Sequence, residues 1–152
     1  MTDVRWYRFS VNPEPWAVGP LGVGRRGGRL YPYMGRNEQL YAFQEAVREE
    51  FGEPDLMEGH LKLTFYFWRE LQPYRTEKTR LARKHEADAT NMQKALEDAL
   101  QGYLYGNDRD NRDIRSIIMA QPAKSSGIIV KAELFSTDAF FEVAGITDWR
   151  NG

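Results

Sequence analysis

The chain has 152 residues, of which 41% are hydrophobic and 28% are charged, and this composition is typical of one globular domain with a single core. It contains no cysteine and two histidines, which excludes disulfides, thiolate metal sites and a cysteine nucleophile and argues against a zinc site built from histidines. The net charge of −1 excludes DNA binding through a broad positive field, so any such binding must use local basic patches.

No stretch of the sequence is long and apolar enough to cross a bilayer. The first ten residues, MTDVRWYRFS, lack the basic and apolar regions of a secretory signal. Together with the absence of cysteine, these features predict a cytoplasmic protein without membrane contact. No internal repeat or low-complexity block divides the chain.

Residues 5–11, RWYRFSV, predict a first strand. The following residues 12–37 are rich in glycine, proline and arginine and predict a long loop. A loop of this length within a compact domain is often functional, and this one forms a candidate basic patch through Arg25, Arg26 and Arg29. The alternative is a solvated loop with no partner.

A helix is predicted from Glu38 to about Phe51, because apolar side chains recur there every three or four residues, and Gly52 is the expected stop. Residues 60–68, HLKLTFYFW, alternate in polarity and predict a strand with one buried face. A second basic patch follows in residues 72–87, a predicted loop that contains Arg80, Arg83 and Lys84.

A second helix is predicted from about Asn91 to Gly102, and two further strands at residues 112–121 and 128–136, joined as a β-hairpin by the turn residues PAKSSG. The order β-α-β-α-β-β predicts a single compact α/β domain over residues 1–152, with a mixed sheet of about four strands and two main helices. The role of the tail stays open, since Phe140 and Phe141 can dock on the core or on another subunit.

The start of the second helix is richer in polar groups than a helix end requires. Thr90 followed by Gln93 matches a capping box, so Thr90 is the expected N-cap, and Asp88 before it meets the positive end of the helix dipole. Lys94 and Asp98 are one turn apart on the predicted polar face, where they can form a surface ion pair. A purely structural role therefore accounts for this segment as well as a catalytic role does.

Residues 107–113, NDRDNRD, place further carboxylates directly after this helix. One interpretation is a polar turn, since Asp and Asn favour turns. A calcium-binding loop is excluded because, counting from Asp108, the sixth position is Asp113 instead of glycine and the twelfth is Met119 instead of glutamate. The other interpretation is that carboxylates from the helix start and from this stretch share one Mg²⁺ ion, which prefers oxygen ligands.

The two segments together, DATNMQKALEDAL and YGNDRDNRDI, resemble the signature of RusA-like Holliday junction resolvases, a family often carried by phages and prophages. That signature has a block Asp-x-Asp-Asn-Leu-x-Lys, then Asp-Ala-Leu, then an aromatic residue shortly before an acidic block. The matching residues are Asp88, Asn91, Met92 and Lys94 in the first block, Asp98–Leu100 in the second, and Tyr105, Asp108 and Asp113 in the third. The resemblance covers about residues 86–114.

This resemblance implies a homodimeric, Mg²⁺-dependent endonuclease that resolves four-way DNA junctions in recombination, repair or phage DNA processing, with Mn²⁺ as a second candidate metal. It implies catalytic roles for Asp88, Lys94 and Asp108, of which Asp88 and Asp108 bind the metal. Thr90 and Asp113 are further candidate metal ligands, and Asn91 and Asp98 are candidate supporting residues. Phosphate contacts are expected from the two basic patches, that is, from Arg25, Arg26, Arg29, Arg80, Arg83 and Lys84.

Two positions depart from the signature, because Thr90 and Asn107 stand where the family pattern has aspartates. Each removes a negative charge from the expected metal site, for which Glu86, Asp110 or Asp113 can compensate. The sequence therefore leaves three alternatives open: a catalytically weak or inactive protein that binds branched DNA, a nuclease for flaps or other branched DNA, and a structural domain whose acidic residues serve only as caps and turns. If a phage encodes the chain, the expected location is the host cytoplasm.

Overall fold

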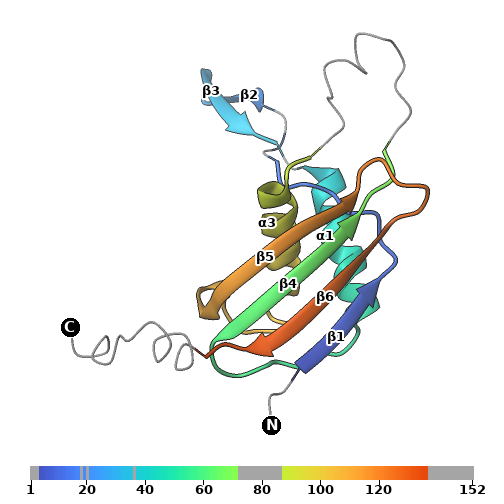
Figure 1. Cartoon of the computed structure of the whole chain (residues 1–152). Helices are drawn as coiled ribbons and strands as arrows, with labels where there is room; N and C mark the ends of the chain where they lie inside the picture. The colour runs from blue at the N-terminus through green and yellow to red at the C-terminus, as the bar shows by residue number, and fades with distance from the viewer. Residues whose placement is uncertain (1–3, 18, 20, 36, 72–86, 137–152) are drawn as a thin grey trace, which may run out of the picture.

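The computed structural model describes residues 4–17, 19, 21–35, 37–71 and 87–136. They form two layers, in which a four-stranded sheet carries helices α1 (Glu38–Phe51) and α3 (Ala89–Leu100) on one face (Figure 1). A two-stranded hairpin projects from the end of the domain at which α3 begins (Figure 1). This arrangement confirms the predicted fold class, a mixed sheet of four strands with two main helices.

The sheet has the order β1-β6-β4-β5, so strands that are neighbours in space are not neighbours in the chain. Its members are β1 (Val4–Phe9), β6 (Gly127–Leu134), β4 (Leu61–Trp68) and β5 (Asn111–Ala120). β4 pairs with β6 in antiparallel and with β5 in parallel orientation. The parallel pair is possible because α3 lies in the connection from the end of β4 to the start of β5.

The predicted β-hairpin between the last two strands is wrong, since β6 pairs with β1 and β4 and not with β5. The connection at residues 121–126 passes over the end of β4 instead. There Arg69, directly after β4, donates its N–H to Ala120 O at 3.0 Å, and its own carbonyl accepts from Ala123 N at 2.8 Å. Because neighbouring strands are only about 4.8 Å apart, this short connection can skip a strand.

The core lies between the inner face of the sheet and the two helices. β4 contributes the alternate side chains that its pattern predicted, Leu61, Leu63, Phe65 and Phe67, all fully buried. α3 contributes one buried helix face, formed by Met92, Ala95, Leu96, Ala99 and Leu100. The predicted core residues of α3 are therefore confirmed apart from Tyr103, which follows the helix and is half-buried.

Helix α1 has the predicted bounds and ends at the predicted Gly52. Two of its side chains bond backbone carbonyls of α3: Gln44 Nε2 donates to Ala95 O at 3.1 Å, and Arg48 Nε donates to Ala99 O at 3.0 Å. The cation of Arg48 thereby lies at the negative end of the α3 dipole, where it is favourable. Neither described helix is long and apolar enough to span a membrane.

Part of the predicted loop at residues 12–37 is a regular hairpin, formed by β2 (Leu21–Arg26) and β3 (Arg29–Met34). Its two turn residues, Gly27 and Gly28, have φ angles of 59° and 78°. Positive φ at both central positions is the geometry of two-residue hairpin turns, and glycine adopts it without strain. The glycines that predicted a loop here form a tight turn.

Residues 12–17, which we call the strap, connect β1 to the hairpin and run over the start of α3. Arg69, which is buried, donates from Nε to Pro13 O at 2.7 Å. Trp16 N donates to Asn91 O in the first turn of α3 at 2.9 Å. The strap therefore has a fixed course across the N-terminal end of α3.

Candidate active site

Asp88 lies exposed at the N-terminus of α3 and is its N-cap. Its Oδ1 accepts the Asn91 N–H at 2.8 Å, and its Oδ2 accepts from the Asn91 side-chain amide at 3.3 Å. The prediction that Thr90 caps the helix is wrong, because α3 begins earlier, at Ala89, and Thr90 lies exposed within its first turn. A carboxylate has about four lone-pair positions, so Asp88 can cap the helix and still bind a cation.

Lys94 lies on the exposed side of α3, between one and two turns after Asp88. Its Nζ lies 3.5 Å from the centroid of the Trp16 ring, within the range of a cation–π interaction. One turn further, burial raises the pKa of Asp98, and the positive charge of Lys94 opposes that increase. The charges of Lys94 and Asp98, for which the sequence predicted a surface ion pair, thus interact with each other.

The contact between Trp16 and Lys94 was not predicted from the sequence. Trp16 lies far from Lys94 along the chain, in a glycine- and proline-rich segment for which no regular structure was expected. The one available signal was an aromatic residue in a segment otherwise typical of a loop.

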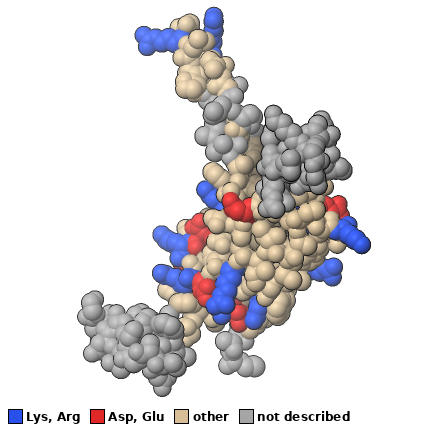
Figure 2. Space-filling view, turned by 45° about the horizontal axis from the view of Figure 1, so that its top comes forward, with Lys and Arg blue, Asp and Glu red and all other residues tan. Residues whose placement is uncertain are grey.

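The arginines of the first basic patch gather at the far end of the hairpin. Arg25, Arg26 and Arg29 are all exposed, and Figure 2 shows basic side chains at this tip and a mixture of both signs on the visible body of the domain. Arg26 is the cross-strand partner of Arg29, so both lie on one face of the hairpin. The second patch, with Arg80, Arg83 and Lys84, lies outside the described residues.

Asp108 begins the short 3₁₀ turn η1 (Asp108–Asp110) between α3 and β5. Asn107 caps this turn, since its Oδ1 accepts the Arg109 N–H at 3.0 Å. Asn107, which stands where the family signature has an aspartate, therefore has a structural role as the cap of this turn. Burial raises the pKa of Glu97 and of Asp98, and the negative charge of Asp108 adds to both increases. Asp108 thus lies near the C-terminal half of α3.

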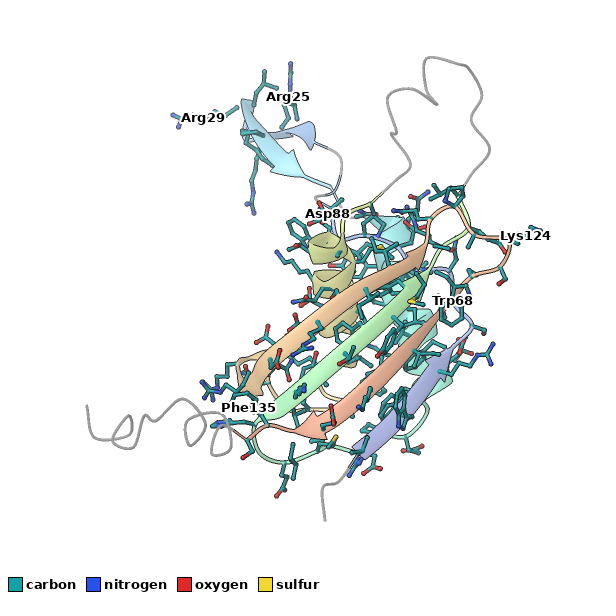
Figure 3. The ribbon with its side chains drawn as sticks, viewed as in Figure 1. Arg25, Arg29, Trp68, Asp88, Lys124 and Phe135 are labelled. Carbon is teal, nitrogen blue, oxygen red and sulfur yellow. The ribbon has the colours of Figure 1, made fainter. Side chains whose placement is uncertain are left out.

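The structure does not bring Asp88 and Asp108 together within one chain. α3 runs antiparallel to β5, as shown by the hydrogen-bonded pairs Ala87–Gln121, Gln93–Ser116 and Glu97–Asn111. A helix rises about 1.5 Å per residue, which puts about 15 Å along the axis between Asp88 and Asp98. Figure 3 shows Asp88 at the end of α3 nearest the hairpin, whereas Asp108 precedes the start of β5 at the other end.

Asp113 is separated from both of these carboxylates by the sheet. Ser116 and the other inward residues of β5 face α3, whereas Asp113 is the register partner of Lys62 and lies 3.9 Å from Arg115 on the outer face. In the part of the chain that is described, no three His, Cys, Asp or Glu side chains are arranged to hold a metal ion. The predicted metal ligands thus occupy three places. Asp88 and Thr90 lie at the start of α3, Asp108 lies toward its other end, and Asp113 lies on the outer face of the sheet.

Glu97, which the sequence did not single out, is the centre of a polar network between α3 and β5. Its two carboxylate oxygens accept from Gln93 Nε2 at 3.1 Å and from Asn111 Nδ2 at 3.4 Å, and Ser116 Oγ donates to Gln93 Oε1 at 2.9 Å. Burial raises the pKa of Glu97, and the hydrogen bonds from Gln93 and Asn111 oppose the increase. Asn111 Oδ1 is buried without a partner within the described structure, so a protonated Glu97 can donate to it after rotation of the Asn111 amide.

The chain matches a known protein family. The family model described as endodeoxyribonuclease RusA matches residues 22–132, which include β3, α1, β4, α3, η1, β5 and most of β2 and β6. The search of curated proteins gave no match.

The raised pKa of Glu97 predicts a pH dependence of stability. A carboxyl whose pKa is higher in the folded state than in the unfolded state stabilises the fold at low pH. This stability is lost as the pH rises from 4.5, the ordinary pKa of a glutamate, through the raised pKa of the folded state. Glu97→Gln, which keeps the shape and cannot ionise, should reduce the loss of stability over that range in urea unfolding at successive pH values. Glu49→Gln, at an exposed position on α1, is the control for the loss of one negative charge. If the free energy of unfolding depends on pH in the same way in the wild type and in Glu97→Gln, the pKa of Glu97 is not raised by folding.

Proposed function

The chain belongs to the RusA endodeoxyribonuclease family, and we propose that it is a Mg²⁺-dependent, structure-selective endonuclease that resolves four-way DNA junctions as a homodimer. The observation that carries this proposal is the family match over residues 22–132. Its geometric support is the start of α3, where an exposed carboxylate, a lysine and the base of an arginine-tipped hairpin lie at one end of the domain.

In this proposal Lys94 is the catalytic cation. Its ammonium group is exposed on one side, carries three N–H donors and lies between one and two turns from Asp88. There it donates to a non-bridging oxygen of the scissile phosphate or to the departing oxygen and offsets the charge that builds up during hydrolysis. Asp98 lies one turn further along α3, where its charge interacts with that of Lys94, and we assign it the supporting role of orienting the ammonium group.

The residues of one subunit do not fit a Mg²⁺ site made by Asp88 and Asp108, because these carboxylates belong to opposite ends of α3. We propose that two subunits complete each site. A two-fold axis perpendicular to α3 would place two α3 helices antiparallel, with Asp88 and Thr90 of one copy near Asp108 of the other. The bound ion would supply positive charge to the phosphate and acidify a water molecule.

The symmetric arrangement suits a four-way junction, since two symmetric cuts require two sites. The hairpin of each subunit would carry its arginines to the DNA at a distance from the cutting centre. Phosphate contacts of this kind fix the position of the DNA and do not depend on its sequence. In this proposal the two hairpins of the dimer would contact separate parts of the branched DNA.

The first test is the substitution Asp88→Asn. Asparagine and aspartate are equally good N-caps, so this change keeps the start of α3 and removes only the carboxylate charge. We expect cleavage of a four-way junction in Mg²⁺ to be abolished and junction binding in EDTA to be preserved. Cutting at the wild-type rate would show that Asp88 has no role in the reaction.

Faster cutting of flaps than of four-way junctions by the wild type would point to the other nuclease substrate.

The two-subunit site predicts complementation between inactive variants. In a heterodimer of Asp88→Asn and Asp108→Asn chains, one shared site carries both changes and the other carries neither. After subunit exchange, the mixture should therefore nick a four-way junction on one strand, while each homodimer alone stays inactive. If each subunit supplied both carboxylates to its own site, both sites of the heterodimer would be defective and no nicking would appear.

The arginines of the hairpin should dominate the salt dependence of DNA binding. Replacing Arg25, Arg26 and Arg29 together by alanine should weaken junction binding and reduce the slope of log K against log salt concentration by about 0.9 for each lost phosphate contact. The matched variant with lysine at all three positions retains the charges and should retain the slope. An unchanged slope in the alanine variant would place the DNA elsewhere on the protein.

A further inference from the structure

The ammonium group of Lys94, the proposed catalytic lysine, contacts the Trp16 ring, which belongs to another segment of the fold. Nζ lies 3.5 Å from the ring centroid, so the ammonium rests against one ring face. The negative face of an indole ring attracts a cation, and tryptophan does so more strongly than phenylalanine. Lys94 is otherwise exposed, so its N–H groups on the side away from the ring are open to a phosphate.

The ring has its position independently of the lysine. The backbone N–H of Trp16 donates to Asn91 O at 2.9 Å, and the Trp16 side chain is half-buried against the core. On one side of it, Arg69 bonds Pro13 O at 2.7 Å. On the other side, Asn37 Nδ2 donates to Ala17 O at 3.3 Å. The strap is thus held by three separate elements, and the ring is a fixed surface on which Lys94 rests.

A lysine without such a surface would spread its ammonium over many positions. Its side chain has four rotatable bonds and loses considerable rotamer freedom when it is held in place. Catalysis by a charged donor depends on its being placed before the reaction begins, because displacement by about 1 Å can cost about 100-fold in rate. A fixed ring beside Nζ meets this requirement without occupying the donors.

We propose that Trp16 is a positioning residue that holds the Lys94 ammonium ready for the scissile phosphate; this inference rests on the proposed endonuclease function. It also assigns a role to the strap, which carries Trp16 to α3 and continues into the arginine-tipped hairpin. The same short segment would then link the place where DNA is gripped to the lysine that acts on it.

The contact itself can be measured without any cleavage. Protons above an aromatic ring resonate upfield, so the ε-CH₂ protons of Lys94 should be shifted upfield in NMR spectra of the full chain. Trp16→Leu should abolish the shift and Trp16→Phe should keep part of it. Trp6→Leu is the matched control, because Trp6 also faces a lysine, Lys131, with Nζ 5.5 Å from its ring, and this change should leave Lys94 unaffected.

The catalytic role is tested by a double-mutant cycle on single-turnover cleavage of a four-way junction. Trp16→Leu should slow cleavage by roughly 10- to 100-fold with unchanged junction affinity, Trp16→Phe should restore much of the rate, and Trp6→Leu should have no effect. In the Lys94→Met background, Trp16→Leu should cause no further loss, because the residues act as a unit. An equal loss in both backgrounds would overturn the inference and leave Trp16 a packing residue.

The two measurements separate this inference from the function on which it rests. A wild-type chain that cuts junctions and shows no upfield shift of Lys94 would overturn the inference alone. A shifted Lys94 in a wild-type chain that cuts no branched DNA would overturn the proposed function, and the positioning role with it. If Trp16→Leu does not fold, Trp16→Phe in both Lys94 backgrounds decides the matter, since a loss of rate independent of Lys94 contradicts the proposal.

Discussion

The antiparallel packing of α3 along β5 is the constraint on which the placement of the polar residues depends. It is fixed by the buried helix face on one side and by the network of Glu97, Gln93, Ser116 and Asn111 on the other. Because the helix and the strand run in opposite directions, residues just before α3 and residues just before β5 lie at opposite ends of the domain. Asp88 and Asp108 are therefore held apart by the same contacts that stabilise the fold.

This separation gives the two ends of α3 different sets of polar side chains. The N-terminal end combines an exposed carboxylate, Lys94 and the strap, and it is the end from which the hairpin projects (Figure 3). The C-terminal end combines Asp108 with the half-buried Glu97 and Asp98, whose raised pKa values reflect burial first and the crowding of negative charge second. A cation that binds at the second end would relieve this crowding, and in a symmetric dimer it would lie beside the first end of the partner.

Much of the fold could be predicted because its signals are local. The periodicity of α1 and of α3 and the alternation of β4 depend only on which residues face the core. The pairing of the last two strands could not be predicted, because a hairpin and a connection that skips one strand present the same alternation and the same turn residues. The β2–β3 hairpin was missed for a related reason: Gly27 and Gly28 are equally typical of a loop and of a two-residue turn.

In the candidate site too, features that depend on local sequence could be predicted, and contacts between distant segments could not. Asp88 and Asn91 lie together because both stand at the start of α3, where Asp88 accepts from Asn91, and Lys94 follows them on the same helix. The N-cap was misassigned to Thr90, since Asp88 and Thr90 are both good caps and only the start of the helix distinguishes them. Trp16 and Glu97 could not be assigned from the sequence, because each depends on contacts between segments that are distant in the chain.

We propose that one cutting site draws its carboxylates from two subunits. The anomalous diffraction of Mn²⁺ in crystals of the protein bound to a four-way junction would locate the metal directly. We expect a metal peak between Asp88 of one subunit and Asp108 of the other, with Lys94 beside the adjacent phosphate. A peak bound by carboxylates of a single subunit, or a dimer in which these two ends of α3 are far apart, would contradict it.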